Sequence, residues 1–182
     1  MNICVFGAAR DEIAPAFFAL GESLGRAMAE RGHTLVFGGG GHGLMGAAAR
    51  GAAEKNGEIV GVAPWFFDTP GVLYDQCTEL VRMDTMAERK TIMRQRSDAF
   101  IALPGGIGTM EEVLEVITLR TLGRTDKPVA FLDGEGYWLP TVEALKKSVE
   151  RGFASDDLLR AFGYFTDAEE CLRYLEENRH DL

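Results

Sequence analysis

The sequence predicts an α/β fold: a single Rossmann-like domain, residues 1–182, with a parallel sheet and helices on both of its faces. Three observations support this prediction. Short apolar runs alternate with helical patterns along the whole chain. The length of 182 residues suits one domain. The 22 glycines are clustered, and two of the clusters lie between a predicted strand and a predicted helix.

The chain begins with a predicted strand, helix and strand. Residues 2–6 form a short apolar run typical of a buried strand. Residues 14–31 are predicted to be helical, Gly32 ends that helix, and residues 34–37 form the second strand. The helical spacing is carried by the apolar residues Phe17, Leu20, Leu24, Ala27 and Met28.

The middle of the chain repeats this alternation with one interruption. Residues 44–56 are rich in alanine and predict a helix that Gly57 closes, and residues 58–62 predict a strand. Residues 63–76 are expected to be irregular because they contain Pro64, Pro70 and Gly71. A fourth strand is predicted at residues 79–81 and a helix at residues 85–97.

The last part of the chain again alternates strands with helices. Strands are predicted at residues 99–103, 128–132 and 162–165, and helices at residues 109–122, 137–151 and 167–177. Strands that alternate with helices in this way form parallel sheets with right-handed crossovers.

The composition excludes several classes of function. The 19 basic and 28 acidic residues give a net charge of −9, which disfavours nucleic-acid and anionic-membrane partners. No apolar run reaches the ~18 residues of a membrane-spanning helix, and the first residues lack the basic segment of a secretory signal. The three cysteines form no CxxC pair and the histidines show no metal-ligand spacing. We therefore expect a cytoplasmic protein with reduced thiols, no metal and no cofactor.

Residues 38–46, the first glycine turn, follow the second predicted strand. Gly41 to Gly46 read as GxGxxG, the pattern of a dinucleotide-binding turn. The acidic residue that such a site needs is missing, since the next strand leads into Ala63 and Pro64. A tight turn with close packing of helix on sheet is the rival interpretation.

Residues 104–109, the second glycine turn, lie between a predicted strand and the helix at 109–122. Gly105, Gly106 and Gly108 allow the backbone amides to turn inward, and the helix dipole adds partial positive charge. Thr109 adds a hydroxyl group. This turn suits an anion of phosphate size, but it is no Walker A loop because no Lys-Ser or Lys-Thr follows.

The helix at residues 85–97 carries four cations: Arg89, Lys90, Arg94 and Arg96. A solvated basic face that balances neighbouring acids is the simpler interpretation, and it fits Lys90 and Arg94. The functional interpretation places Arg89 near the helix start, facing the second glycine turn, where its forked guanidinium would grip a phosphate or a ribose.

Glu112 has two interpretations of similar weight. Thr109 to Glu112 match the capping box S/T-x-x-E, in which Glu112 would only bond the amide of Thr109. Alternatively, Glu112 is a catalytic carboxylate.

Together these motifs resemble the Lonely Guy (LOG) family, whose signature is RK followed by PGGxGTxxE. Arg89 and Lys90 give the first part, and Pro104 to Glu112 give the second. The resemblance implies a Rossmann-like homodimer that cleaves the N-glycosidic bond of cytokinin riboside 5′-monophosphates, with AMP as a further substrate. It implies free base and ribose 5-phosphate as products, and neither metal nor cofactor.

The resemblance also assigns roles to residues. Arg89 and Glu112 match the catalytic pair of the family. Substrate and phosphate contacts are expected from Lys90, Gly105, Gly106, Ile107, Gly108, Thr109, Glu111 and Thr118, and from Gly39 and Gly40 of the first turn. Two segments depart from the family pattern, residues 7–10 and 65–71, and both are expected to shape the nucleotide end of the pocket, so the sequence leaves the base preference open.

Two further functions were weighed. Relatives are often labelled lysine decarboxylases, yet no lysine here is marked as a Schiff-base site. A non-hydrolytic nucleotide- or molybdenum-cofactor-binding carrier is the main alternative, since carriers share the fold and the glycine turns. The Arg89 and Glu112 pair favours the hydrolase, because a carrier has no need of the acid.

Overall fold

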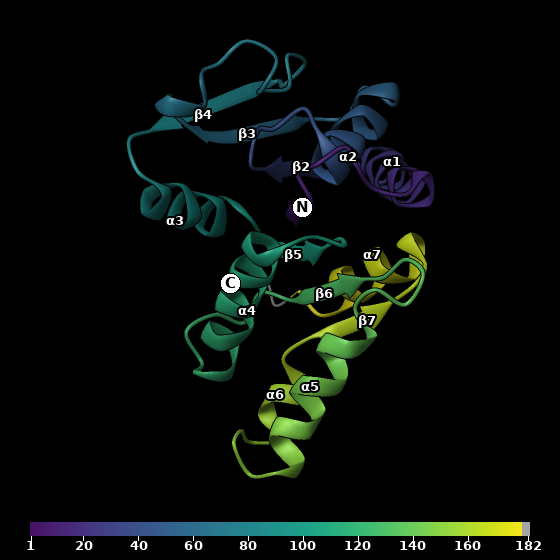
Figure 1. The fold of residues 1–182 in the computed structure, drawn as a ribbon, viewed down its shortest axis with the longest axis vertical. Helices are drawn as coiled ribbons and strands as arrows, with labels where there is room; N and C mark the ends of the chain where they lie inside the picture. Colours follow the sequence, from purple (N-terminus) through teal and green to yellow (C-terminus); the bar gives the residue numbers. More distant parts are fainter. Residues whose placement is uncertain (180–182) are drawn as a thin grey trace.

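The computed structural model describes residues 1–179 and contains one sheet of seven parallel strands (Figure 1). The strand order is β4-β3-β2-β1-β5-β6-β7. The strands are β1 Asn2–Phe6, β2 Thr34–Phe37, β3 Ile59–Pro64, β4 Glu79–Met83, β5 Ala99–Ala102, β6 Val129–Leu132 and β7 Gly163–Phe165. The order runs outward in both directions from β1 and β5, so the crossovers change sides between these two strands. In open parallel sheets, ligands bind beyond the carboxyl ends of the strands at such a reversal.

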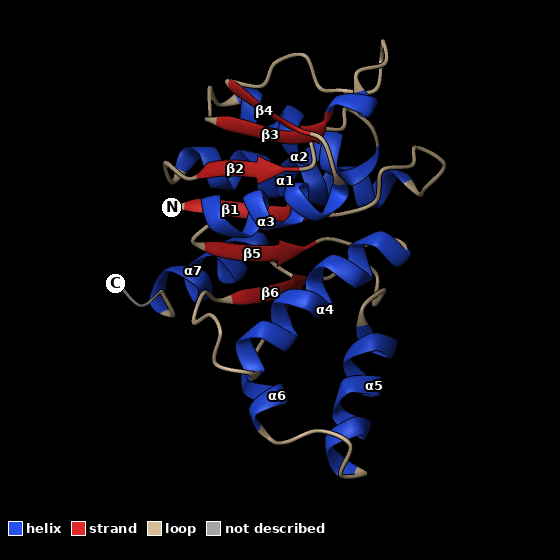
Figure 2. Ribbon diagram, turned by 90° about the vertical axis from the view of Figure 1, so that its left-hand side faces the viewer, coloured by secondary structure: helices blue, strands red, loops and turns tan. Residues whose placement is uncertain are grey.

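Helices cover both faces of the sheet (Figure 2). One face carries α1, α2 and α7, and the other carries α3 and α4, while α5 and α6 extend beyond the β7 side of the sheet. The helices are α1 Pro15–Glu30, α2 Gly43–Glu54, α3 Met86–Arg96, α4 Ile107–Thr121, α5 Leu139–Glu150, α6 Asp157–Arg160 and α7 Ala168–Glu177, with the short 3₁₀ helix η1 at Trp65–Phe67.

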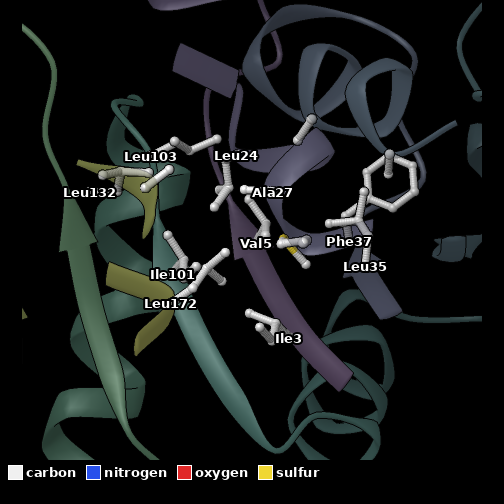
Figure 3. Packing of buried hydrophobic residues seen from close by; sticks show 14 of the residues in the cluster. Ile3, Val5, Leu24, Ala27, Leu35, Phe37, Ile101, Leu103, Leu132 and Leu172 are labelled. Carbon is white, nitrogen blue, oxygen red and sulfur yellow. The ribbon is translucent and has the colours of Figure 1, made fainter. Parts of the chain in front are cut away.

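The core follows from the two-residue period of the strands. On β1, Ile3 and Val5 face the layer of α1, α2 and α7, whereas Cys4 and Phe6 face the layer of α3 and α4. The residues on both faces of this strand are buried, as expected for a central parallel strand. Figure 3 shows the first of these clusters, where Val5 meets Leu24 of α1 and Ile101 of β5.

The predicted fold class is confirmed, and every predicted strand and helix is present; β1 and β2 have the predicted ends, and the other elements have ends shifted by up to a few residues. Two short helices, η1 and α6, were not predicted, because three or four residues carry too little periodicity to detect. The largest consequence comes from α4, which begins at Ile107 rather than at residue 109. Within residues 1–179, no helix is both long and apolar enough to cross a membrane.

Candidate active site

A cavity of about 700 Å³ lies beyond the carboxyl ends of β1 and β5, at the reversal of the sheet. The loop after β1 forms one wall, and the second glycine turn with the start of α4 forms another. Arg89 and Lys90 of α3 complete the polar side. Much of the remaining lining is apolar and includes Ile13, Phe17, Leu44, Met45, Phe67, Met86 and Tyr137. The departing residues 7–10 and Phe67 of the departing segment 65–71 therefore lie in the cavity wall.

The amides at the start of α2, in the first glycine turn, are already bonded within the protein. Leu44 and Met45 donate to the carbonyl of Ala8 at 2.8 and 3.4 Å, and Gly43 donates to the carboxylate of Asp11 at 2.8 Å. Gly46 is required by close packing, since a Cβ there would lie 2.0 Å from the carbonyl oxygen of Gly41. The GxGxxG pattern is a packing turn, and the dinucleotide interpretation fails because the amides it needs are taken.

The amides of the second glycine turn are differently placed. Among residues 1–179, no acceptor bonds the amides of Gly106, Ile107, Gly108 and Thr109. These amides stand at the start of the fifteen-residue helix α4, where the helix dipole adds partial positive charge. A Cβ on Gly106 or Gly108 would meet no atom within 4 Å, so both glycines face open space. This turn has the donors and the room to accept an anion.

Arg89 is held rigidly although its charge is nearly buried. Arg89 is only 6% exposed to solvent. Its Nε donates to the carbonyl of Val62 at 3.0 Å, and its Nη1 donates to Oε1 of Glu112 at 3.2 Å. Its Nη2 occupies a slot beside Gly38, where any Cβ would lie 1.8 Å from that nitrogen. A capping box formed by Thr85 and Glu88 fixes the helix start that carries Arg89.

Glu112 does not cap its helix, so the capping interpretation is wrong. Gly106 is the N-cap of α4 and no side chain caps this end. Thr109 is the third residue of the helix, and its hydroxyl lies beside Gly105. Burial raises the pKa of Glu112, and the charge of Arg89 opposes that rise. Glu112 is thus a largely buried carboxylate held by a buried cation, and carboxylates with a raised pKa are frequent at functional sites.

Lys90 and Arg94 are partly exposed and are balanced by neighbouring acids, as the simpler interpretation of this helix expects. Both bond acidic residues of α4: Lys90 contacts Glu111, and it also lies 3.1 Å from Glu115. Arg94 lies 2.5 Å from Glu115. Hydrogen bonding to Glu111 raises the pKa of Lys90. A Schiff-base lysine needs the opposite shift, toward a neutral amine.

The remaining predicted site residues separate into two groups. Ile107 lies at the cavity rim and is 84% exposed. Gly39, Gly40 and Thr118 do not line the cavity in this chain. Gly40 bridges to Leu73, and the Thr118 hydroxyl bonds the carbonyl of Leu114 at 2.8 Å.

Sequence reasoning missed much of the apolar lining and, among the residues that shape the site, Gly38, Phe17 and Tyr137. Gly38 leaves room for the guanidinium of Arg89, and the two aromatic rings line the cavity. Phe17 was interpreted only as a core residue of its helix. Tyr137 lies in no motif, and its hydroxyl donates to the carbonyl of Gly105 at 2.6 Å. Gly38 lies in the first glycine turn, but no local signal gives it this role, and none marks Phe17 or Tyr137, because each acts through a neighbour remote in the sequence.

Comparison with known proteins places this site in a family. A family described as possible lysine decarboxylase matches residues 45–175. A probable cytokinin riboside 5′-monophosphate phosphoribohydrolase of Oryza sativa subsp. japonica is 39% identical over 85% of this chain and 73% of the relative. A cytokinin riboside 5′-monophosphate phosphoribohydrolase of Arabidopsis thaliana is 37% identical over 97% of this chain and 81% of the relative. The chain belongs to the Lonely Guy family.

The solved structures support the fold alone. The molybdenum cofactor binding protein of Rippkaea orientalis superposes with a TM-score of 0.74 at 22% identity, covering 97% of this chain and 95% of that one. The chain therefore shares its fold with that protein.

Proposed function

We propose that this protein hydrolyses the N-glycosidic bond of adenine-type riboside 5′-monophosphates, including cytokinin ribotides and AMP, giving free base and ribose 5-phosphate. The observation that carries the proposal is the buried Arg89–Glu112 pair beside a turn with unbonded amides. The names of the relatives, at 37–39% identity, support the same reaction.

The 5′-phosphate would bind the second glycine turn. The amides of residues 106–109 supply donors, and the dipole of α4 supplies partial positive charge. Open space at Gly106 and Gly108 lets the phosphate approach the backbone closely. The anchored phosphate would then hold the ribose at a fixed distance from Glu112, five residues into the same helix.

Glu112 would supply the negative charge that the reaction needs. Breaking the bond between C1′ and the base builds positive charge on the sugar, which a nearby carboxylate stabilises. The oxygen of a water bonds C1′ as the bond to the base breaks, and the proton lost by water replaces the sugar on the base. Glu112 is positioned to orient that water and receive its proton on the way.

Arg89 would have two roles in the reaction. Its charge keeps Glu112 ionised against the effect of burial, and its guanidinium orients the ribose or polarises the leaving base. Both require the guanidinium to stay where Val62 and Gly38 hold it.

The apolar wall suits a base with a hydrophobic substituent. Phe17, Leu44, Met45 and Phe67 line the cavity. An adenine ring stacked there, or an isoprenoid group attached to it, would bury apolar surface.

Homodimer assembly and a cytoplasmic location belong to the same proposal. Ile107 at the cavity rim and Leu122 at the end of α4 are 84% and 65% exposed. A second copy that covered them would remove apolar surface from water. Cys4, Cys77 and Cys171 are free thiols, as expected in a reducing compartment.

One assay tests the proposal against the carrier alternative. The protein is incubated with AMP, isopentenyladenosine monophosphate, GMP, CMP and the matching nucleosides, and the released bases are identified by chromatography. We expect base release from the adenine-type monophosphates and far slower release from the nucleosides. Binding of these nucleotides without any base release would contradict hydrolysis and support a carrier.

A further inference from the structure

The loop between β6 and α5 reaches back to the second glycine turn through one side chain. The hydroxyl of Tyr137 donates to the carbonyl of Gly105 at 2.6 Å. The same residue is 39% exposed and lines the cavity. Tyr137 thus joins a segment outside all recognised motifs to the turn that presents unbonded amides.

Tyr137 stands on a rigid support. Its neighbour Trp138 is fully buried, and the indole Nε1 of Trp138 donates to the carbonyl of Ala102 at 3.1 Å. The Trp138 amide donates to the buried carboxylate of Asp133 at 3.2 Å. The other oxygen of Asp133 accepts from the hydroxyl of Tyr164 at 2.5 Å. The ring of Tyr137 also meets Phe17 edge-on, with centroids 6.3 Å apart.

The backbone before Tyr137 is shaped to present it. Glu135 has φ 56° and Gly136 has φ 76°, so two consecutive residues occupy the left-handed region. For Glu135 this conformation is costly. The hydrogen bonds of Asp133 and Trp138 offset that cost.

Holding the carbonyl of Gly105 has a direct consequence for Gly106. The carbonyl and the N–H of one trans peptide point in opposite directions. When Tyr137 fixes the carbonyl of Gly105, it also fixes the direction of the Gly106 N–H, which is among the unbonded amides. Without this bond, a peptide between two glycines has wide conformational freedom.

The hydrogen bond from Tyr137 also affects the electrostatics of the turn. A carbonyl oxygen that turned toward a bound phosphate would repel it, and the hydroxyl of Tyr137 holds this oxygen in another direction. Because hydrogen bonds polarise one another along a chain, donation to the Gly105 carbonyl also makes the Gly106 amide a better donor.

We propose that Tyr137 is a positioning residue for an anionic ligand: its hydroxyl orients the Gly105–Gly106 peptide so that the second glycine turn binds a phosphate group. The inference rests on the proposed function for its substrate, a nucleoside 5′-monophosphate. It requires only phosphate binding, which is measured without any reaction.

The test uses Tyr137→Phe, which removes the hydroxyl and keeps the ring. Calorimetry with inorganic phosphate and ribose 5-phosphate should show both dissociation constants raised about five- to tenfold, the loss typical of one hydrogen bond. KM for AMP should rise by a similar factor, and kcat should stay within about twofold. The matched control is Tyr74→Phe, which removes a hydroxyl bonded to Gln76 outside this cavity and should leave all these values unchanged.

The outcomes separate this inference from the proposed function. Unchanged phosphate affinity and KM in Tyr137→Phe, with active wild-type protein, would overturn the inference and leave the hydrolase intact. Weakened phosphate binding in that variant, with no base released by the wild type, would overturn the hydrolase and support the inference. A fall in kcat with KM unchanged would place Tyr137 at the reacting atoms and overturn the positioning role, as would a wild type that binds neither anion.

Discussion

The two glycine turns look alike in sequence and differ in what their amides do. Both follow a central strand and begin a helix. At the start of α2, the amides of Gly43, Leu44 and Met45 are bonded to Asp11 and Ala8. At the start of α4, the amides of residues 106–109 have no acceptor among the described residues. A glycine turn is a candidate binding site only when its donors are free.

The glycines of the two turns also differ in whether the fold leaves room for a side chain. A Cβ on Gly46 would collide with the backbone at 2.0 Å, whereas Gly106 and Gly108 face open space. The first turn needs glycine for the fold, and the second keeps two glycines that the fold does not require. Glycine without an internal reason points to a ligand that approaches the backbone.

The most severe test of this comparison substitutes one glycine in each turn. Gly46→Ala should destabilise the protein by about 3 kcal/mol, because the methyl group meets an immovable carbonyl. Gly108→Ala should keep or raise stability, since alanine favours helices by up to about 1 kcal/mol. Thermal melts of both variants and calorimetry with phosphate give the readout. Gly108→Ala should weaken phosphate binding while the melting temperature holds; equal destabilisation by both substitutions would erase the distinction between the turns.

The first turn contributes to chemistry at one position, Gly38, through Arg89. Gly38→Ala should push Nη2 of Arg89 from its slot and lower kcat by about tenfold or more. Arg89→Lys should lose most activity as well, because a point charge cannot copy the fork. Steady-state base release from AMP measures both, with melts to show that the fold persists. Wild-type rates in Gly38→Ala would mean that the slot has no catalytic importance.

The raised pKa of Glu112 predicts opposite effects of pH on activity and stability. Activity needs the carboxylate, so kcat/KM should fall below a pKa that lies above the ordinary 4.5. A raised pKa in the folded state means that stability from this group is present below 4.5 and lost as pH rises through the folded pKa. The difference in melting temperature between wild type and Glu112→Gln, followed from pH 4 to 8, isolates this contribution. If kcat/KM still fell at low pH in Glu112→Gln, a group other than Glu112 would be responsible for that fall.

The smallest effect is expected at the clasp of the first turn, formed by His42 and Asp11. Both ring nitrogens of His42 face acceptors, the Asp11 carboxylate at 2.6 Å and the carbonyl of Gly71 at 2.8 Å. Hydrogen bonding to Asp11 raises the pKa of His42 above 6.5. Its stabilisation is therefore full below pH 6.5 and lost as pH rises through the folded pKa.

His42→Gln is the variant that checks the clasp. The melting temperature should fall by only about 1–2 °C near pH 6 and by less at higher pH, since both partners are exposed. Phosphate affinity should stay at the wild-type value. A larger loss at pH 9 than at pH 6 would reverse the assigned protonation.

Much of the fold was predictable because the strands are short apolar runs between clear helical patterns. The order of the strands was not predictable, because the local sequence of β1 does not specify that its neighbours in the sheet are β2 and β5. The start of α4 was misjudged by two residues because Thr109 imitates a cap, whereas Gly106 fills that position through its backbone. That small error supported the capping interpretation of Glu112.

Site residues that lie in a sequence motif were predictable, whereas residues that act through a tertiary contact were not. Arg89 and Glu112 lie in motifs, and the structure brings them to 3.2 Å. Gly38 and Tyr137 act through Arg89 and Gly105, partners that only the folded chain identifies. Gly39, Gly40 and Thr118 match a pattern but lie outside the cavity wall of this chain.

The central claim is that Glu112 is the carboxylate of a hydrolase rather than a structural acid. The most direct measurement compares wild type with Glu112→Gln for base release from AMP and from isopentenyladenosine monophosphate. Glutamine preserves the shape and can still accept the hydrogen bond from Arg89, so the variant should fold and bind phosphate with the affinity of the wild type. Base release should fall by on the order of 10²-fold or more, because the amide neither receives a proton nor offsets a cationic sugar. Wild-type rates of base release in Glu112→Gln would contradict the account.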